Sequence, residues 1–213
     1  MPEEAATARG FRFEHLRRNY TVVHASLRIL LARYLDACPL AVRLTAGPNG
    51  KPYVDPPCCV QFNLSHSEDS VLFAFTASRE IGVDLEMVRP LEDMLDIAQR
   101  FFCPEEACEL ASLHANEQLH AFFRCWTRKE AYLKAVGDGL RTSPNTFRVS
   151  LHPTEPARLI HVNGNHDAAL KWNFQNIEAS PSFVAAVAYS GPPLAIRTIY
   201  WPSLVNLVQS YRR

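Results

Sequence analysis

The chain has 213 residues, 47% hydrophobic and 21% charged, and its 22 basic side chains balance its 22 acidic ones. This length and composition suffice for a full core, as one large domain or two small ones. Zero net charge gives no broad field for nucleic acid or an anionic membrane, and neither an N-terminal signal segment nor a run of ~18 apolar residues is seen. We therefore expect a cytoplasmic protein with no nucleic-acid or membrane partner.

The six cysteines show no C-x-x-C pair and no zinc-finger spacing with histidine, so we expect them to be reduced and structural. The adjacent Cys58 and Cys59 could close only a strained ring, and they lead into an apolar segment. Burial is therefore expected for this pair.

In the first half of the chain, apolar residues at helical spacing predict an amphipathic helix over residues 21–37. Period-two segments and turn residues then predict strands at 41–45, 59–64, 71–76 and 81–88, with a turn at 47–52.

The second half opens with helical patterns. Helices are expected at residues 91–102, 105–113 and 117–136, the second introduced by Pro104 and paired acids and the third stopped by Gly137 and Gly139. Strands are expected at 146–151, 159–161, 170–174, 183–188 and 196–200, with a hairpin connection at 163–167.

Both halves place a helix before antiparallel strands. This order predicts an α+β fold built as a pseudo-twofold pair of similar subdomains, each a helix packed on a small antiparallel sheet. The expected division is 1–98 for the N-terminal subdomain and 99–213 for the C-terminal one, with the active site at the seam.

An acidic strand is the first candidate for chemistry. In Ile81-Gly82-Val83-Asp84-Leu85-Glu86, period two sends Asp84 and Glu86 to one face, where they could hold a cation. The alternative is that the two acids only solvate the exposed face of a half-buried strand.

A charged helix supplies the second candidate. In the run from Trp126 to Lys134, helical spacing puts Glu130 and Lys134 on one stripe with Lys129 beside them. Together with the strand, this provides three carboxylates and two lysines, a set that suits a magnesium-bound pyrophosphate. Ordinary i,i+4 pairing on a solvated helix would explain the charges but not their coincidence with the acidic strand.

The third candidate is Phe62-Asn63-Leu64-Ser65-His66-Ser67, where an apolar strand runs into polar residues. Ser65 and His66 could bind phosphate, although Asn63, Ser65 and Ser67 also suit a turn. Neither a Gly-x-Ser-x-Gly elbow nor a Walker loop occurs, so serine-hydrolase and P-loop readings lack their signatures.

Taken in order, these segments closely resemble the surfactin-type (Sfp-type) 4′-phosphopantetheinyl transferases. The resemblance extends over residues 17–188 and rests on Gly50-Lys51-Pro52, the 62–67 and 81–86 segments, Arg100-Phe101-Phe102, Trp126 to Lys134, and Gly137-Asp138-Gly139-Leu140. It implies a monomeric enzyme that uses Mg²⁺ to move the 4′-phosphopantetheine arm of coenzyme A to a serine of an apo acyl or peptidyl carrier protein. Adenosine 3′,5′-bisphosphate is then released.

The resemblance also implies residue roles. The metal ligands would be Asp84, Glu86 and Glu130. Glu130 and Lys134 would be catalytic, and the coenzyme A contacts would be Arg28, Lys51, Ser65, His66, Lys129 and Lys134.

Two other functions remain open from the residues. One is a Mg²⁺-dependent nucleotide pyrophosphohydrolase acting on coenzyme A, because the same groups would serve water as well as serine. The other is a non-catalytic binder of coenzyme A or of a carrier protein. The intact set of acids and Lys134 argues against the binder.

Overall fold

The computed structural model describes residues 2–138 and 141–210. Internal contacts divide the chain into two compact units. The smaller contains the described residues up to Thr45, Tyr53–Val60 and those from Ile196 onward, and the larger contains Ala46–Pro52 and Gln61–Ala195. The expected division into 1–98 and 99–213 concerns an internal duplication, which these units do not test, and it stays a prediction.

In the smaller unit, helix α2 (Glu14–Leu35) packs against α1 (Pro2–Gly10) and α7 (Leu204–Ser210). Its buried face includes Leu27 and Leu31, and it ends where Asp36 adopts a left-handed conformation with φ of 48°. The helix expected at 21–37 is therefore confirmed, with an earlier start.

Two short strands, β1 (Arg43–Ala46) and β2 (Pro52–Asp55), pair with each other. The strand expected at 196–200 is wrong: this segment has no regular structure, and Ile199 and Tyr200 are 62% and 67% exposed.

The centre of the larger unit is an antiparallel sheet in the order β5 (Ile81–Met87), β9 (Phe183–Ser190) and β8 (Trp172–Asn176). A hairpin of β3 (Val60–Ser67) and β4 (Ser70–Ala77) precedes it, and β6 (Phe147–Val149) pairs with β7 (Leu159–Val162). Strand β3 runs through Ser65 and Ser67, so the turn considered for these residues is wrong.

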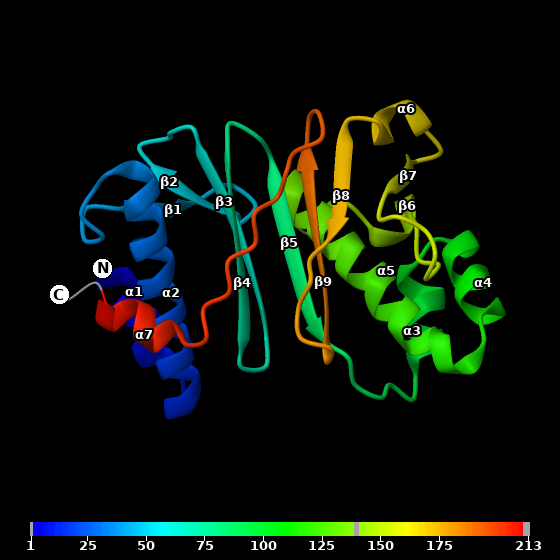
Figure 1. Ribbon diagram of the computed structural model, residues 1–213, viewed down its shortest axis with the longest axis horizontal. Coiled ribbons are helices and arrows are strands. Elements are labelled where there is room, and N and C mark those ends of the chain that lie inside the picture. The colour runs from blue at the N-terminus through cyan, green and yellow to red at the C-terminus, as the bar shows by residue number, and fades with distance from the viewer. Residues whose placement is uncertain (1, 139–140, 211–213) are drawn as a thin grey trace. The chain divides into compact units, whose positions relative to one another are not determined.

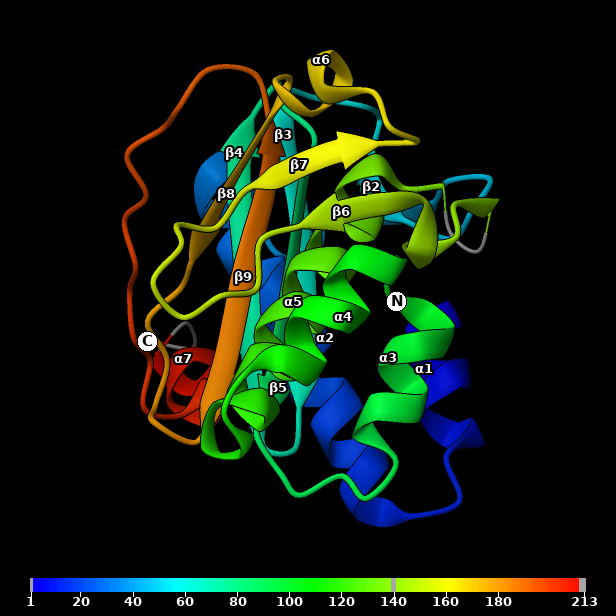
Figure 2. The same cartoon turned by 90° about the vertical axis from the view of Figure 1, so that its right-hand side faces the viewer.

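The long helix α5 (Ala115–Val136) lies along one face of β5 and β9 (Figures 1 and 2). It ends at Gly137, which has φ of 74°, while Gly139 and Leu140 lie outside the described residues. Helices α3 (Met94–Phe101), α4 (Pro104–Ser112) and the short α6 (His166–Ala169) complete the unit.

Small residues allow α5 to approach the sheet closely. Gly82 pairs with Ala188, and Asp84 pairs with Ala186. A Cβ atom added at Gly82 would lie 2.1 Å from the carbonyl oxygen of Ala131 in α5. Glycine is therefore required where the strand and helix backbones meet.

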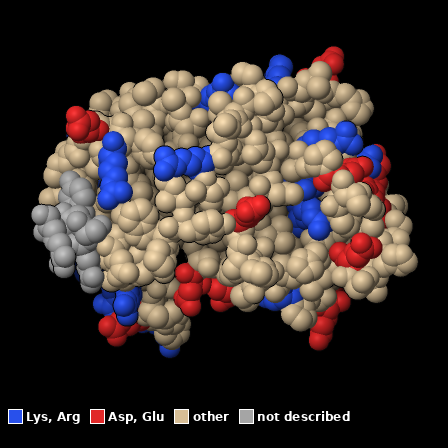
Figure 3. Space-filling model, viewed as in Figure 1, with Lys and Arg blue, Asp and Glu red and all other residues tan. Residues whose placement is uncertain are grey.

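The α+β class is thus confirmed: helices pack on small antiparallel sheets. Within the described residues none of the six cysteines is joined in a disulfide, and the expected burial is wrong for Cys59, which is exposed. On the face drawn in Figure 3, basic and acidic side chains are interspersed. Within the described part of the chain, every helix is too short or too polar to cross a membrane.

Candidate active site

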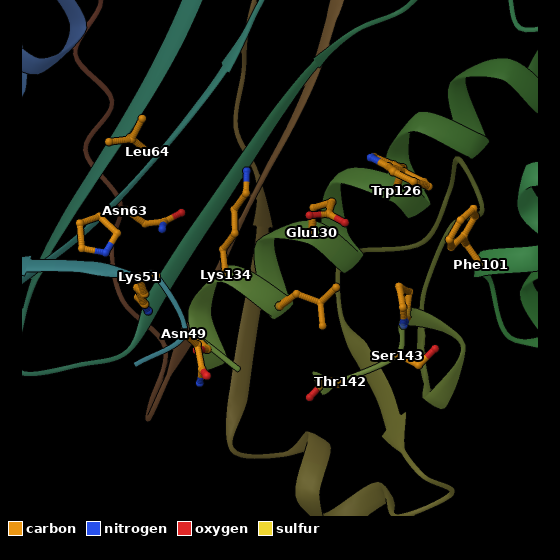
Figure 4. Close-up of a pocket in the computed structure, with 15 residues that line it drawn as sticks. Asn49, Lys51, Asn63, Leu64, Phe101, Trp126, Glu130, Lys134, Thr142 and Ser143 are labelled. Atoms are coloured by element: carbon orange, nitrogen blue, oxygen red, sulfur yellow. The ribbon is translucent and has the colours of Figure 1, made fainter. Parts of the chain in front are cut away.

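A pocket of about 580 Å³ opens beside α5 in the larger unit. Figure 4 shows Glu130 and Lys134 projecting from α5, with Trp126 and Phe101 toward one end and Lys51 toward the other. The wall is mainly apolar, so a charge inside it is less well hydrated than one at the open surface.

Asp84 is the most deeply placed of the three acids, with only 3% of its surface exposed. Its Oδ1 accepts from Lys134 Nζ at 2.6 Å and from Ser65 Oγ at 2.8 Å. Its Oδ2 is also buried and finds no hydrogen-bond partner among the described residues. A solvated strand face is therefore the wrong interpretation for this residue.

Glu86 and Glu130 share the electrostatic surroundings of Asp84. Burial raises the pKa of each of the three carboxyl groups. The charge of Asp84 raises the pKa values of Glu86 and Glu130 further, whereas Lys134 opposes the rise in all three. Such a cluster gains stability from an added positive charge.

The donor set suits a hard divalent cation. Carboxylate oxygens are the ligands that such ions prefer, and Asp84 Oδ2 is a buried oxygen for which residues 2–138 and 141–210 provide no hydrogen-bond partner. As the side chains stand in residues 2–138 and 141–210, however, no three His, Cys, Asp or Glu side chains converge closely enough to hold a metal. Lys134 takes the other oxygen of Asp84, so the site is partly satisfied by an internal cation.

The raised pKa values predict a pH-dependent stability. At a pH between the ordinary pKa of 4.5 and the raised pKa, Glu130 is protonated in the folded protein and ionised in the unfolded chain. The free energy of unfolding therefore falls as the pH rises through this range. Glu130→Gln removes this effect. In EDTA, the melting temperature of the variant minus that of wild type should increase by a few degrees from pH 5 to pH 8. Circular dichroism melts test this, and a difference that stays flat or falls with pH contradicts it.

Three residues expected to contact coenzyme A differ in their surroundings. Ser65 bonds directly to Asp84 and Lys134. Lys51 lines the pocket, but its ammonium donates to the carbonyls of Ile81 at 3.1 Å and Ala135 at 2.7 Å. His66 is exposed, on the opposite face of β3 from Ser65.

Arg28 belongs to the smaller unit. Its guanidinium donates to both carboxylate oxygens of Glu4, at 3.0 and 3.1 Å, and to the carbonyl of Val42.

Lys129 points into the core rather than into the pocket. It is 2% exposed, and its Nζ lies 2.7 Å from a carboxylate oxygen of Glu106, which is fully buried. The same ammonium donates to the carbonyls of Pro144 and Phe147 at 2.9 and 2.6 Å. Pro144 lines the pocket, so the hydrogen bond from Lys129 helps to hold this part of the pocket wall in place.

Comparison with known proteins decides the family. The model of the 4′-phosphopantetheinyl transferase superfamily matches residues 80–188, the span that holds the acidic strand, α5 and most of β9. The chain belongs to this superfamily. The enzyme class expected from the motifs is thereby confirmed.

Individual transferases match over most of the chain. The 4′-phosphopantetheinyl transferase HetI of Nostoc sp. is 38% identical over 192 residues, which is 89% of this chain and 78% of HetI. The transferase Sfp of Bacillus subtilis is 27% identical over 191 residues, covering 90% of this chain and 82% of Sfp.

In this transferase, the buried pair predicts a structural effect for Lys129→Met. The substitution leaves Glu106 charged, buried and without its cation, which costs about 3–5 kcal/mol of unfolding free energy. Thermal melts should show a large destabilisation, and Lys171→Met, at an exposed lysine, should show little. A variant that keeps wild-type stability but requires more coenzyme A would instead support the phosphate contact implied by the resemblance.

Sequence reasoning missed several residues that shape this transferase site. Asn63 and Ser67 flank Ser65 on the same face of β3 and bond to β5. The sequence pattern indicates Glu106 only as part of a helix start, although its carboxylate also accepts from the backbone N–H groups of Cys103 and Val149. The period-two spacing of Asn63, Ser65 and Ser67 was the available signal for a shared face.

Proposed function

We propose that this transferase moves the 4′-phosphopantetheine arm of coenzyme A to a serine hydroxyl of an apo acyl or peptidyl carrier protein, with Mg²⁺ as cofactor. Adenosine 3′,5′-bisphosphate is the second product. The observation that carries the proposal is the buried Asp84 carboxylate, which is joined to Lys134 beside Glu130 and has one oxygen without a hydrogen-bond partner among the described residues. Membership of the transferase superfamily supports it.

Asp84, Glu86 and Glu130 would hold the Mg²⁺ ion. When bound, the ion would neutralise charge on the diphosphate of coenzyme A. The raised pKa values of these three carboxyls, caused first by burial, support this assignment because a cation would stabilise the charged form that burial disfavours. It would also relieve the repulsion that Asp84 exerts on Glu86 and Glu130.

Glu130 is the proposed general base. In the transfer, the serine oxygen forms a bond to the β-phosphorus of coenzyme A, and the bond from that phosphorus to the bisphosphate oxygen breaks. The serine proton passes to the Glu130 carboxylate, which faces the pocket. Its raised pKa, caused first by burial, makes it a stronger base than an ordinary glutamate.

Lys134 is proposed to stabilise the departing phosphate. Its ammonium has three N–H donors, and the side chains of Asp84 and Ser65 occupy two of them. In the part of the chain that the structure describes, the third donor has no acceptor, so it would serve a phosphate oxygen. Fixing the lysine beforehand reduces the reorganisation needed as negative charge develops.

The remaining assignments follow from the resemblance to the family. We retain Arg28, Lys51, Ser65, His66 and Lys129 as coenzyme A contacts, on the strength of the motif resemblance alone. A monomer in the cytoplasm, built from duplicated halves with the site at their seam, is likewise retained.

The function is tested by incubating the protein with coenzyme A, Mg²⁺ and a panel of apo carrier proteins, then measuring the intact mass of each carrier. We expect a phosphopantetheine adduct that is lost in EDTA. Cleavage of coenzyme A with every carrier unmodified would identify a pyrophosphohydrolase. Binding of coenzyme A without either reaction would identify a non-catalytic binder.

A further inference from the structure

Three polar side chains of β3 satisfy backbone N–H groups along one edge of β5. Asn63 Oδ1 accepts from Val83 N at 2.9 Å. Ser65 Oγ accepts from Leu85 N at 3.3 Å, and Ser67 Oγ accepts from Met87 N at 3.0 Å. The constant step of two residues on both strands shows that they run in the same direction in a fixed register.

The three side chains are nearly removed from solvent: Asn63, Ser65 and Ser67 are 6%, 5% and 8% exposed. Buried polar groups that make good hydrogen bonds hold their neighbours in one arrangement, and leaving their partners unsatisfied is costly. This polar ladder, Asn63, Ser65 and Ser67, therefore fixes where β5 lies.

The two serines repeat one geometry. Ser65 accepts from the backbone of Leu85 and donates to the carboxylate of Asp84 at 2.8 Å. Ser67 accepts from the backbone of Met87 and donates to Oε2 of Glu86 at 3.3 Å. A serine hydroxyl has one proton to donate. In each case the hydroxyl accepts from a backbone N–H of β5 and donates its proton to the acid that precedes that residue in β5.

Glu86 depends on this contact more than Asp84 does. Asp84 is also held by the ammonium of Lys134. Within residues 2–138 and 141–210, Ser67 is the one hydrogen-bond partner found for the Glu86 carboxylate, and no ion pair within 4.0 Å is formed there. The direction of the Glu86 side chain is thus set by a single hydroxyl.

We propose that Ser67 is a positioning residue that aims the Glu86 carboxylate at the divalent ion, with Ser65 doing the same for Asp84. The proposal rests on the proposed function, because it takes Glu86 as a metal ligand. Ser67 itself touches neither substrate nor ion. Loss of a group that orients a metal ligand typically lowers metal affinity by ~10- to 100-fold.

The direct test is a Mn²⁺ titration followed by electron paramagnetic resonance, with coenzyme A present and no carrier protein. Ser67→Ala should weaken Mn²⁺ binding by about tenfold. Ser67→Thr keeps the hydroxyl and should restore most of the affinity, and Ser70→Ala, on the neighbouring β4, should match wild type. Wild-type affinity in Ser67→Ala would overturn the proposal.

A double-mutant cycle separates positioning from a purely structural role. If Ser67 acts through Glu86, Ser67→Ala should have little further effect on Mn²⁺ affinity in a Glu86→Gln background. An equal loss in both backgrounds would assign Ser67 to strand docking alone and overturn the proposal. Ser67→Cys, which keeps the side-chain volume, provides the same comparison if Ser67→Ala does not fold.

Failure of this proposal is distinguishable from failure of the function. Carrier modification by the wild type, together with Mn²⁺ binding that ignores Ser67, would leave the function standing and remove the positioning role. If the wild type modifies no carrier, but Ser67→Ala lowers Mn²⁺ affinity and this effect disappears in the Glu86→Gln background, the positioning role would stand and the proposed function would fail.

Discussion

Glu130→Gln is expected to lower the turnover of carrier modification at least about a hundredfold. The amide keeps the size of the side chain but can neither accept the serine proton nor give a charged ligand to the ion. Because the side chain faces the pocket from the C-terminal half of α5 rather than packing in the core, the fold should be retained. Initial rates at saturating coenzyme A and carrier, measured by intact mass, give the comparison.

Glu117→Gln is the matched control, since Glu117 lies in the first turn of the same helix. Its turnover should stay close to that of wild type. Near-normal turnover in Glu130→Gln would remove this residue from the mechanism. A rise in the coenzyme A requirement alone would limit Glu130 to substrate binding.

Gly82→Ala is expected to have the largest effect on stability. The added Cβ would lie 2.1 Å from Ala131 O and 2.3 Å from Ala135 N, and both atoms belong to the backbone of α5. No rotamer change relieves such a contact, so helix and strand must separate. We expect a loss of about 3 kcal/mol or more, and a melting temperature lower by roughly 10 °C.

The same separation should reduce activity even at temperatures where the variant is folded. Asp84 comes from the strand and Lys134 from the helix, and their 2.6 Å contact depends on the distance between the two backbones. Gly10→Ala serves as the control, because a Cβ at Gly10 meets nothing within 4 Å. A melting temperature within a degree or two of wild type in Gly82→Ala would show that the helix can shift at little cost.

Periodicity predicted the elements whose patterns are long or sharply bounded. The helix at 117–136 matches α5 almost residue for residue, because a glycine with positive φ stops it. The strand at 81–88 matches β5 for a similar reason, its alternation being bounded at both ends. The same reasoning wrongly predicted a strand at 196–200. Residues with a high β-propensity form a strand only where a neighbouring strand can pair with them.

The motifs indicate where the site lies in the sequence, but they do not determine the direction of each side chain. Sequence spacing put Lys129 and Glu130 side by side, yet one turns into the core toward Glu106 and the other into the pocket. Adjacent positions on a helix differ by about 100° in direction, and only the packing of α4 and β6 decides which way is buried. The bonds of Lys51 to two carbonyls are equally invisible in a sequence, because any exposed oxygen attracts an ammonium.

The hydroxyl and amide groups that β3 places along β5 also protect the molecule against aggregation through an exposed strand edge. An outer strand with unsatisfied main-chain donors is a template on which another polypeptide can add, and this is a common route to fibrils. Here Val83, Leu85 and Met87 present those donors to Asn63, Ser65 and Ser67 instead. The same polar side chains of β3 that contact Asp84 and Glu86 thus prevent another polypeptide from pairing with the hydrophobic strand β5.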